Sequence, residues 1–118
     1  MKNTLYAAIA IVSLLLTQTT WAQETRETIC APIDVTSSRD MVQLTCADEV
    51  RDGGENVHFF AVLTAEAVFA DRFLNTATTA LARGRALLVQ YLGKSLLPGD
   101  PTPSCGKECR LVVAISIR

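Results

Sequence analysis

The chain is poor in the residue types that most catalytic and nucleic-acid-binding sites use. Aromatic residues make up 6% of its 118 positions, His58 is the only histidine, and 11 lysines and arginines face 12 acidic residues. One histidine leaves little to act as a base beside a serine or cysteine nucleophile. The formal net charge of −1 disfavours general nucleic-acid binding, which usually shows a concentrated basic face.

Long apolar runs are also scarce, and the one that stands out lies at the N-terminus. Lys2 precedes an apolar run over residues 5–16, and a polar stretch ending in Ala22 follows it. This order is typical of a secretory signal peptide, and the run is shorter than the roughly 20 residues that a spanning helix needs. We predict a signal peptide over residues 1–22, cleaved after Ala22, with an N-terminal membrane anchor as the alternative.

The remaining residues, 23–118, have the length of a single small domain. Cleavage removes one lysine and no acidic residue, so the formal net charge becomes −2. The domain is expected to be secreted or periplasmic, with no membrane contact after the signal is removed. A core of this size is modest, and covalent cross-links would help to stabilise it.

All four cysteines, Cys30, Cys46, Cys105 and Cys109, lie in this domain. An even number of cysteines in a short exported chain predicts disulfide bonds. A zinc site is disfavoured, because only the last two cysteines have the short spacing usual among zinc ligands. Three residues separate those two cysteines, so they do not match the thioredoxin-type C-x-x-C motif either.

Two alternating runs, residues 29–35 and 41–47, flank a turn-rich cluster and predict a β-hairpin. A hairpin centred on Ser38 places Cys30 directly opposite Cys46, within the usual range of a disulfide. We therefore predict the pairs Cys30–Cys46 and Cys105–Cys109, the second closing a small loop on itself. Pro32 suggests an edge position or a bulge in the first run.

Three further strands and one helix are predicted. Residues 56–63 form a strand that is apolar on both faces, with Phe60 and Val62 opposite Val57, Phe59, Ala61 and Leu63. Residues 65–83 show helical spacing, with Thr64 as the N-terminal cap and Gly84 ending the helix. The apolar stripe of this helix consists of Phe69, Phe73, Ala77 and Ala80.

Residues 85–92 form the next strand, and residues 110–117 form the last. In the last strand Leu111, Val113, Ile115 and Ile117 are expected to point inward, and Val112, Ala114 and Ser116 outward. The predicted order is β-β-β-α-β-β, which is mainly β with one helix. It fits an OB-fold-like five-stranded antiparallel barrel. The alternative is an open antiparallel sheet with the helix on one face.

The candidate sites are few, and each has a structural interpretation. His58 lies within an apolar strand, where a packed histidine is commoner than a metal ligand. The acidic residues Asp48, Glu49, Asp52 and Glu55 are interpreted as a solvated loop, because their spacing matches no calcium-binding loop. Arg72, Arg83 and Arg85 are either an anion site or an ordinary solvated face. No catalytic, cofactor-binding or metal-ligating residue is therefore assigned, and no cofactor is expected.

The order of elements resembles a known family. A signal peptide, a hairpin with Cys30 and Cys46, a Phe/Ala/Leu-bearing helix ending in Gly84, and two close cysteines are similar to the small B subunits of subtilase-cytotoxin-like AB toxins. The resemblance implies an OB barrel, a ring of B subunits and binding of cell-surface glycans. It carries over no glycan-binding residue, because the segment before Cys30 lacks the aromatic and serine residues that such subunits use.

The sequence thus favours an exported, non-enzymatic binding or assembly module that takes a glycan or protein ligand. It is expected to form a homo-oligomer, such as a ring, through strand edges or outward apolar faces, and to bind no nucleic acid. The alternative is a small periplasmic enzyme or enzyme inhibitor.

Overall fold

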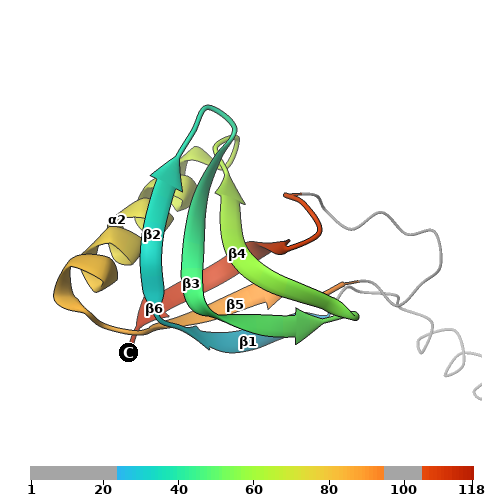
Figure 1. Cartoon of the computed structure of the whole chain (residues 1–118). Helices are drawn as coiled ribbons and strands as arrows, with labels where there is room; N and C mark the ends of the chain where they lie inside the picture. Colours follow the sequence, from blue (N-terminus) through green and yellow to red (C-terminus); the bar gives the residue numbers. More distant parts are fainter. Residues whose placement is uncertain (1–23, 95–104) are drawn as a thin grey trace, which may run out of the picture.

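The computed structural model describes residues 24–94 and 105–118 and shows a curled sheet with one helix (Figure 1). The predicted signal peptide lies outside these ranges. The strands are β1 (Thr25–Cys30), β2 (Pro32–Ser37), β3 (Met41–Asp52), β4 (Glu55–Leu63), β5 (Leu87–Leu92) and β6 (Cys109–Ile117). The described helix is α2 (Ala67–Arg83), which lies between β4 and β5 in the chain.

The six strands form one sheet in the order β1-β5-β6-β4-β3-β2. Four of the neighbouring pairs are antiparallel, whereas β4 and β6 run parallel over residues 59–61 and 109–111. The prediction of a mainly β fold with one helix is confirmed. The predicted order was wrong in having one strand too few, and the predicted all-antiparallel pairing was wrong at the β4–β6 pair.

The additional strand arises because the first strand of the hairpin is divided at Ala31. The residues before the break form β1 and pair with β5, while Pro32 begins β2, which pairs with β3. Proline lacks the N–H group that a continuous ladder would use, so it suits the start of a strand. A single stretch of chain therefore supplies both ends of the sheet.

The Cys30–Cys46 disulfide joins β1, at one end of the sheet, to β3, which is the neighbour of β2 at the other end. Its Cα atoms are 5.3 Å apart, and beside it the Ala47 N–H donates a hydrogen bond of 2.9 Å to the Ala31 oxygen. The predicted pair is confirmed, but the predicted geometry was wrong, because Cys46 lies opposite Pro32 and Cys30 lies opposite Leu87. The bond draws β1 towards β3 and curls the sheet into a half-barrel (Figure 1).

The helix α2 covers the core of this half-barrel with one face. Its buried residues are Ala70, Phe73, Ala77 and Ala80, which agree with the predicted stripe except that Phe69 is only partly buried. Gly84 ends the helix in the left-handed conformation with φ 62°, as predicted. Thr64 is not the N-terminal cap, because the helix begins two residues later than expected and the Thr64 hydroxyl donates to the Arg39 oxygen.

The predicted faces of β6 were partly wrong because the strand contains a bulge. Tyr91 pairs with Val112 and Gln90 pairs with Ala114, which leaves Val113 without an opposite residue. One extra residue reverses the alternation of side chains between the two faces. Val112 is therefore buried and Val113 is 43% exposed, whereas Ile115 packs against the core as expected.

The predicted faces of β4 are also partly wrong, and the strand is irregular at the same place. The register with β3 shifts between the pairs Thr45–Phe59 and Val50–Val57, and the N–H groups of both His58 and Phe59 donate to the Glu108 oxygen. Val57 shares the core face with Phe60 and Val62 instead of opposing them. Phe59, which was expected on the same face as Val57, lies outside the core cluster and is only partly buried.

Candidate functional site

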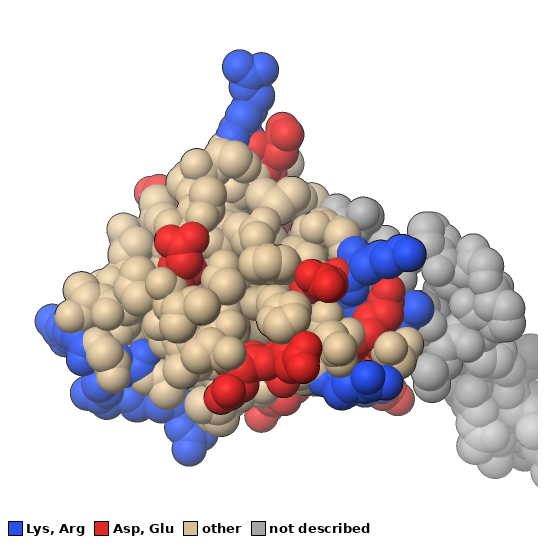
Figure 2. Space-filling view, in the orientation of Figure 1, with Lys and Arg blue, Asp and Glu red and all other residues tan. Residues whose placement is uncertain are grey.

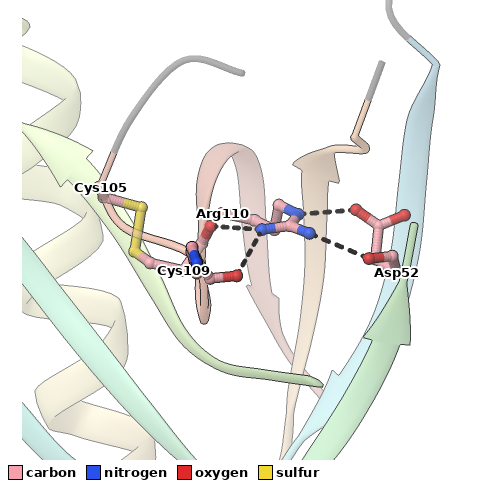
Figure 3. The surroundings of a disulfide bond; sticks show 5 residues. Asp52, Cys105, Cys109 and Arg110 are labelled. Atoms are coloured by element: carbon pink, nitrogen blue, oxygen red, sulfur yellow. Dashed lines mark hydrogen bonds and ion pairs between the residues drawn. A yellow bond between two sulfur atoms is a disulfide. The ribbon is translucent and has the colours of Figure 1, made fainter. Parts of the chain in front are cut away.

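An ion pair between Asp52 and Arg110 lies inside the fold, close to one of the two disulfides (Figure 3). Asp52 is the last residue of β3 and Arg110 is the second residue of β6. Each is 1% exposed, and they are the only charged side chains buried within residues 24–94 and 105–118. The Arg110 Nε atom lies 2.7 Å from Oδ2 of Asp52. Burial of two charges is tolerated only when both are well paired.

The Arg110 guanidinium uses all five of its N–H groups. Besides the Nε bond, Nη2 donates to the main-chain oxygen of Asp52 at 3.0 Å and to Oε1 of Glu55 at 3.1 Å. Nη1 donates to the main-chain oxygens of Cys109 at 2.8 Å and Lys107 at 3.2 Å. Since arginine has five donors and no acceptor, this side chain is fully satisfied by the protein.

The Asp52 carboxylate is held by three different segments. Its Oδ2 atom accepts both the Arg110 bond and the main-chain N–H of Lys94 at 2.7 Å. Its Oδ1 atom lies 3.1 Å from Nη1 of Arg26 on β1, but this contact lacks the alignment of a hydrogen bond. At the surface, Glu55 Oε1 also pairs with Lys94 Nζ at 3.3 Å. The cluster therefore ties together β1, β3, β4, β6 and the residues after β5.

The surroundings of Asp52 act on its pKa in opposite directions. Burial alone raises the pKa, but hydrogen bonds from Arg110 and the Lys94 N–H, with the positive charges of Arg110 and Arg26, outweigh it, so the pKa lies below its ordinary value of 3.8. For Glu55 too, desolvation raises the pKa, while Lys94 and Arg110 lower it further than desolvation raises it. Burial and the Asp52 charge raise the pKa of Tyr91. Asp52 is thus a stable anion, poorly suited to carry a proton near neutral pH.

The lowered Asp52 pKa predicts a loss of stability in acid. Because the folded pKa lies below the unfolded one, the stabilisation is fully present above about pH 4 and is lost as the pH falls through the folded value. We expect the free energy of unfolding in urea to fall steeply below pH 4 in the wild type and less steeply in Asp52→Asn. Asp71 is an exposed residue on α2, so Asp71→Asn is the control and should keep the wild-type dependence of the unfolding free energy on pH. Equal slopes in wild type and Asp52→Asn would contradict the assignment.

The structure places the acidic residues and the histidine considered as candidate site residues in different environments. The acidic run is not a loop, because β3 continues through Asp52 to a turn at Gly53 and Gly54. Asp52 and Glu55 belong to the ion cluster, whereas Asp48 is exposed. His58 Nε2 lies 3.2 Å from Glu49 Oε2, with both side chains more than a third exposed. Such a pair contributes little to stability at the surface.

Arg72 and Arg85, two of the three arginines considered as either an anion site or a solvated face, make different contacts. Arg72 lines a groove of about 570 Å³ between α2 and β6, together with Phe69, Asn75, Thr76 and residues 113–115. Arg85 instead donates from Nε to the main-chain oxygen of Arg118 at 2.8 Å. Figure 2 shows basic side chains gathered at the lower left and acidic and basic side chains intermixed at the right. A single anion site formed by the three arginines is therefore not supported.

The sequence interpretation missed Arg110 and Arg26 as members of a site. Arg110 was noted only as the start of the last strand, and Asp52 only as part of a solvated loop. The sequence does contain a signal for this pair. Arg110 begins the predicted last strand, which is apolar, and Asp52 comes directly before the Gly53-Gly54 turn, so two opposite charges lie at strand ends. Their contact joins residues 58 positions apart, which the alternation pattern within one strand does not reveal.

The second disulfide, Cys105–Cys109, is confirmed and closes a five-residue ring beside Arg110 (Figure 3). Two disulfides indicate an oxidising, extracytoplasmic location. The part of the chain that the structure describes contains no cluster of three or more His, Cys, Asp or Glu side chains able to hold a metal ion. Nor does it contain a helix long and apolar enough to cross a membrane. Comparison of the chain with protein-family models, curated proteins and solved structures gives no match.

Proposed function

We propose that this protein is an exported, non-enzymatic binding or assembly module built on an OB-like barrel. If β1 and β2 are counted as one bent strand, five strands follow each other around the curl, with the helix between the third and fourth. This arrangement supports an OB-like interpretation, because the OB-fold is a five-stranded, partly open barrel. OB-folds commonly bind extended polymers such as oligosaccharides, which fits the glycan or protein ligand suggested by the toxin resemblance.

The buried ion cluster supports a binding module over a small periplasmic enzyme. A general acid or base must release or accept a proton, and its pKa is usually tuned towards the working pH. The Asp52 pKa is shifted the other way, and Arg110 has no donor left for a substrate. These groups fit a structural role in the fold.

The observation that carries the assembly proposal is that, among the described residues, several strand segments are paired on one side only. β2 pairs with β3 on one side only, and β6 beyond Leu111 pairs only with β5. Exposed apolar side chains lie on these strands, namely Ile33 on β2 and Val113 and Ile117 on β6. α2 packs against both strands but pairs with neither. An unpaired strand edge with apolar side chains is a template for another strand. We infer that copies of the chain associate by pairing these edges.

The sequence predicts self-association through strand edges or through outward apolar faces, and the residues named for those faces lie elsewhere. Phe60, Val62 and Val112 were considered as outward apolar residues, but all three are buried in the core. The exposed large apolar side chains of the described residues include Ile33 and Val113, at the irregularities of β2 and β6. These two residues are the ones that the edge-pairing proposal uses.

Sedimentation of the purified protein at micromolar concentration tests this proposal. We expect a mass above that of one chain, and a shift towards the monomer in Val113→Lys and in Ile33→Lys, because a charge at a pairing edge opposes association. Val68→Lys is the matched control, since Val68 is 69% exposed but lies on α2. A wild type that is monomeric throughout would contradict self-association and leave the enzyme-inhibitor alternative standing.

A further inference from the structure

The two disulfides differ in their access to solvent. Cys30 and Cys46 are both buried, at 1% and 3% exposure, under the curl of the sheet. In the other disulfide Cys109 is buried, but Cys105 is partly exposed. A surface groove of about 400 Å³ lies along the Cys105–Cys109 ring and is otherwise lined by Gln43 and Phe59. The second disulfide is therefore the more exposed of the two in the intact fold.

The ring closed by Cys105 and Cys109 presents three carbonyl groups to the rest of the protein. The carbonyls of Lys107 and Cys109 accept both hydrogen bonds of Arg110 Nη1. The Glu108 carbonyl accepts the N–H groups of His58 and Phe59 on β4, at 2.9 and 3.0 Å. Inside the ring, the Cys109 N–H donates to Gly106, whose φ of 118° suits only glycine. The small ring therefore fixes the oxygens on which a buried guanidinium depends.

We propose that Cys105–Cys109 is a thiol-accessible redox site whose reduction loosens the buried Arg110–Asp52 pair. A dithiol supplies the two electrons. Its thiolate attacks Cys105 Sγ, the S–S bond breaks, and Cys109 leaves as a thiolate that takes up a proton. The second thiol of the reagent then displaces Cys105 from the mixed disulfide, so that the reagent ends as a cyclic disulfide and the protein as two thiols.

Opening the ring acts on Arg110 through its backbone partners. Without the covalent closure, the Lys107 and Cys109 carbonyls are no longer held in place, and Nη1 of Arg110 loses two fixed acceptors. A buried donor without a partner is unfavourable, so the reduced protein should unfold more easily. The effect should reach the Asp52 carboxylate, because its Oδ2 atom accepts a hydrogen bond from Arg110 Nε. It should also reach the Lys94 N–H, which donates to the same oxygen.

The first test is the order in which the disulfides are reduced in the native protein. Protein recovered after expression of the full chain is treated with limiting dithiothreitol, alkylated and mapped by mass spectrometry. We expect Cys105 and Cys109 to be labelled more than about tenfold faster than Cys30 and Cys46, whose exposure requires opening of the core. Equal labelling rates for all four cysteines, or labelling only after unfolding, would overturn the proposal.

The second test asks whether the ring acts through Arg110. Cys105→Ser/Cys109→Ser, which mimics the reduced ring, should lower Tm by at least about 4 °C. The same pair of changes in an Asp52→Leu/Arg110→Met background should lower Tm less, because that background lacks the ion pair that the ring supports. Equal decreases in the two backgrounds would show that the ring stabilises the fold independently of the ion pair. Native-state labelling still decides access if a variant fails to fold.

Discussion

Arg110→Met should lower the free energy of unfolding by about 3–5 kcal/mol, the usual effect of removing one partner from a buried ion pair. The change leaves the Asp52 carboxylate buried beside an apolar side chain, and it frees the Lys107 and Cys109 carbonyls. Urea unfolding at pH 7 measures the effect. Arg51→Met, at an exposed arginine next to Asp52 in β3, should change stability by no more than about 0.5 kcal/mol.

The double variant Asp52→Leu/Arg110→Met distinguishes a lost pair from a lost side chain. Replacing both members of a buried ion pair by apolar residues is often close to neutral. The double variant should therefore be more stable than the sum of the two single effects predicts. Additive losses of stability would mean that Asp52 and Arg110 stabilise the fold through separate contacts and not through the ion pair between them.

Phe73→Ala should also destabilise the protein by about 3–5 kcal/mol, because it leaves a cavity where a fully buried ring packs against the sheet. Phe73 is at the centre of the buried face of α2, between Ala70 and Ala77. Val68→Ala, on the exposed face of the same helix, is the control and should leave the thermal unfolding temperature almost unchanged. A small effect at Phe73 would contradict the packing of α2 on the core.

Much of the local structure could be predicted, because it follows from nearby residues. The spacing of Phe73, Ala77 and Ala80 indicated the helix, and Gly84 indicated its end. The Cys105–Cys109 pair followed from its short spacing. In each case the determining residues are close together in the sequence, so periodicity and turn chemistry suffice.

The errors arose where distant segments determine the outcome. Whether Val112 or Val113 is buried depends on a bulge opposite β5, and whether Asp52 is solvated depends on Arg110, 58 residues away. The division of the first strand at Ala31 depends on a partner strand that begins at Leu87. No pattern within one strand contains this information, because a register shift of one residue exchanges the two faces.

The division of the chain at Ala31 has a consequence for the order of folding. β1 pairs with β5 between Thr25 and Leu92, so the first strand of the described chain meets its partner only after most of the chain is available. Pairings between residues so far apart in the sequence form slowly, because a long loop must close first. β2, β3 and β4 are joined by short turns and can pair early. We therefore expect closure of the half-barrel by the β1–β5 pairing to be the late step, and a chain crossing a membrane would stay open until β5 has emerged.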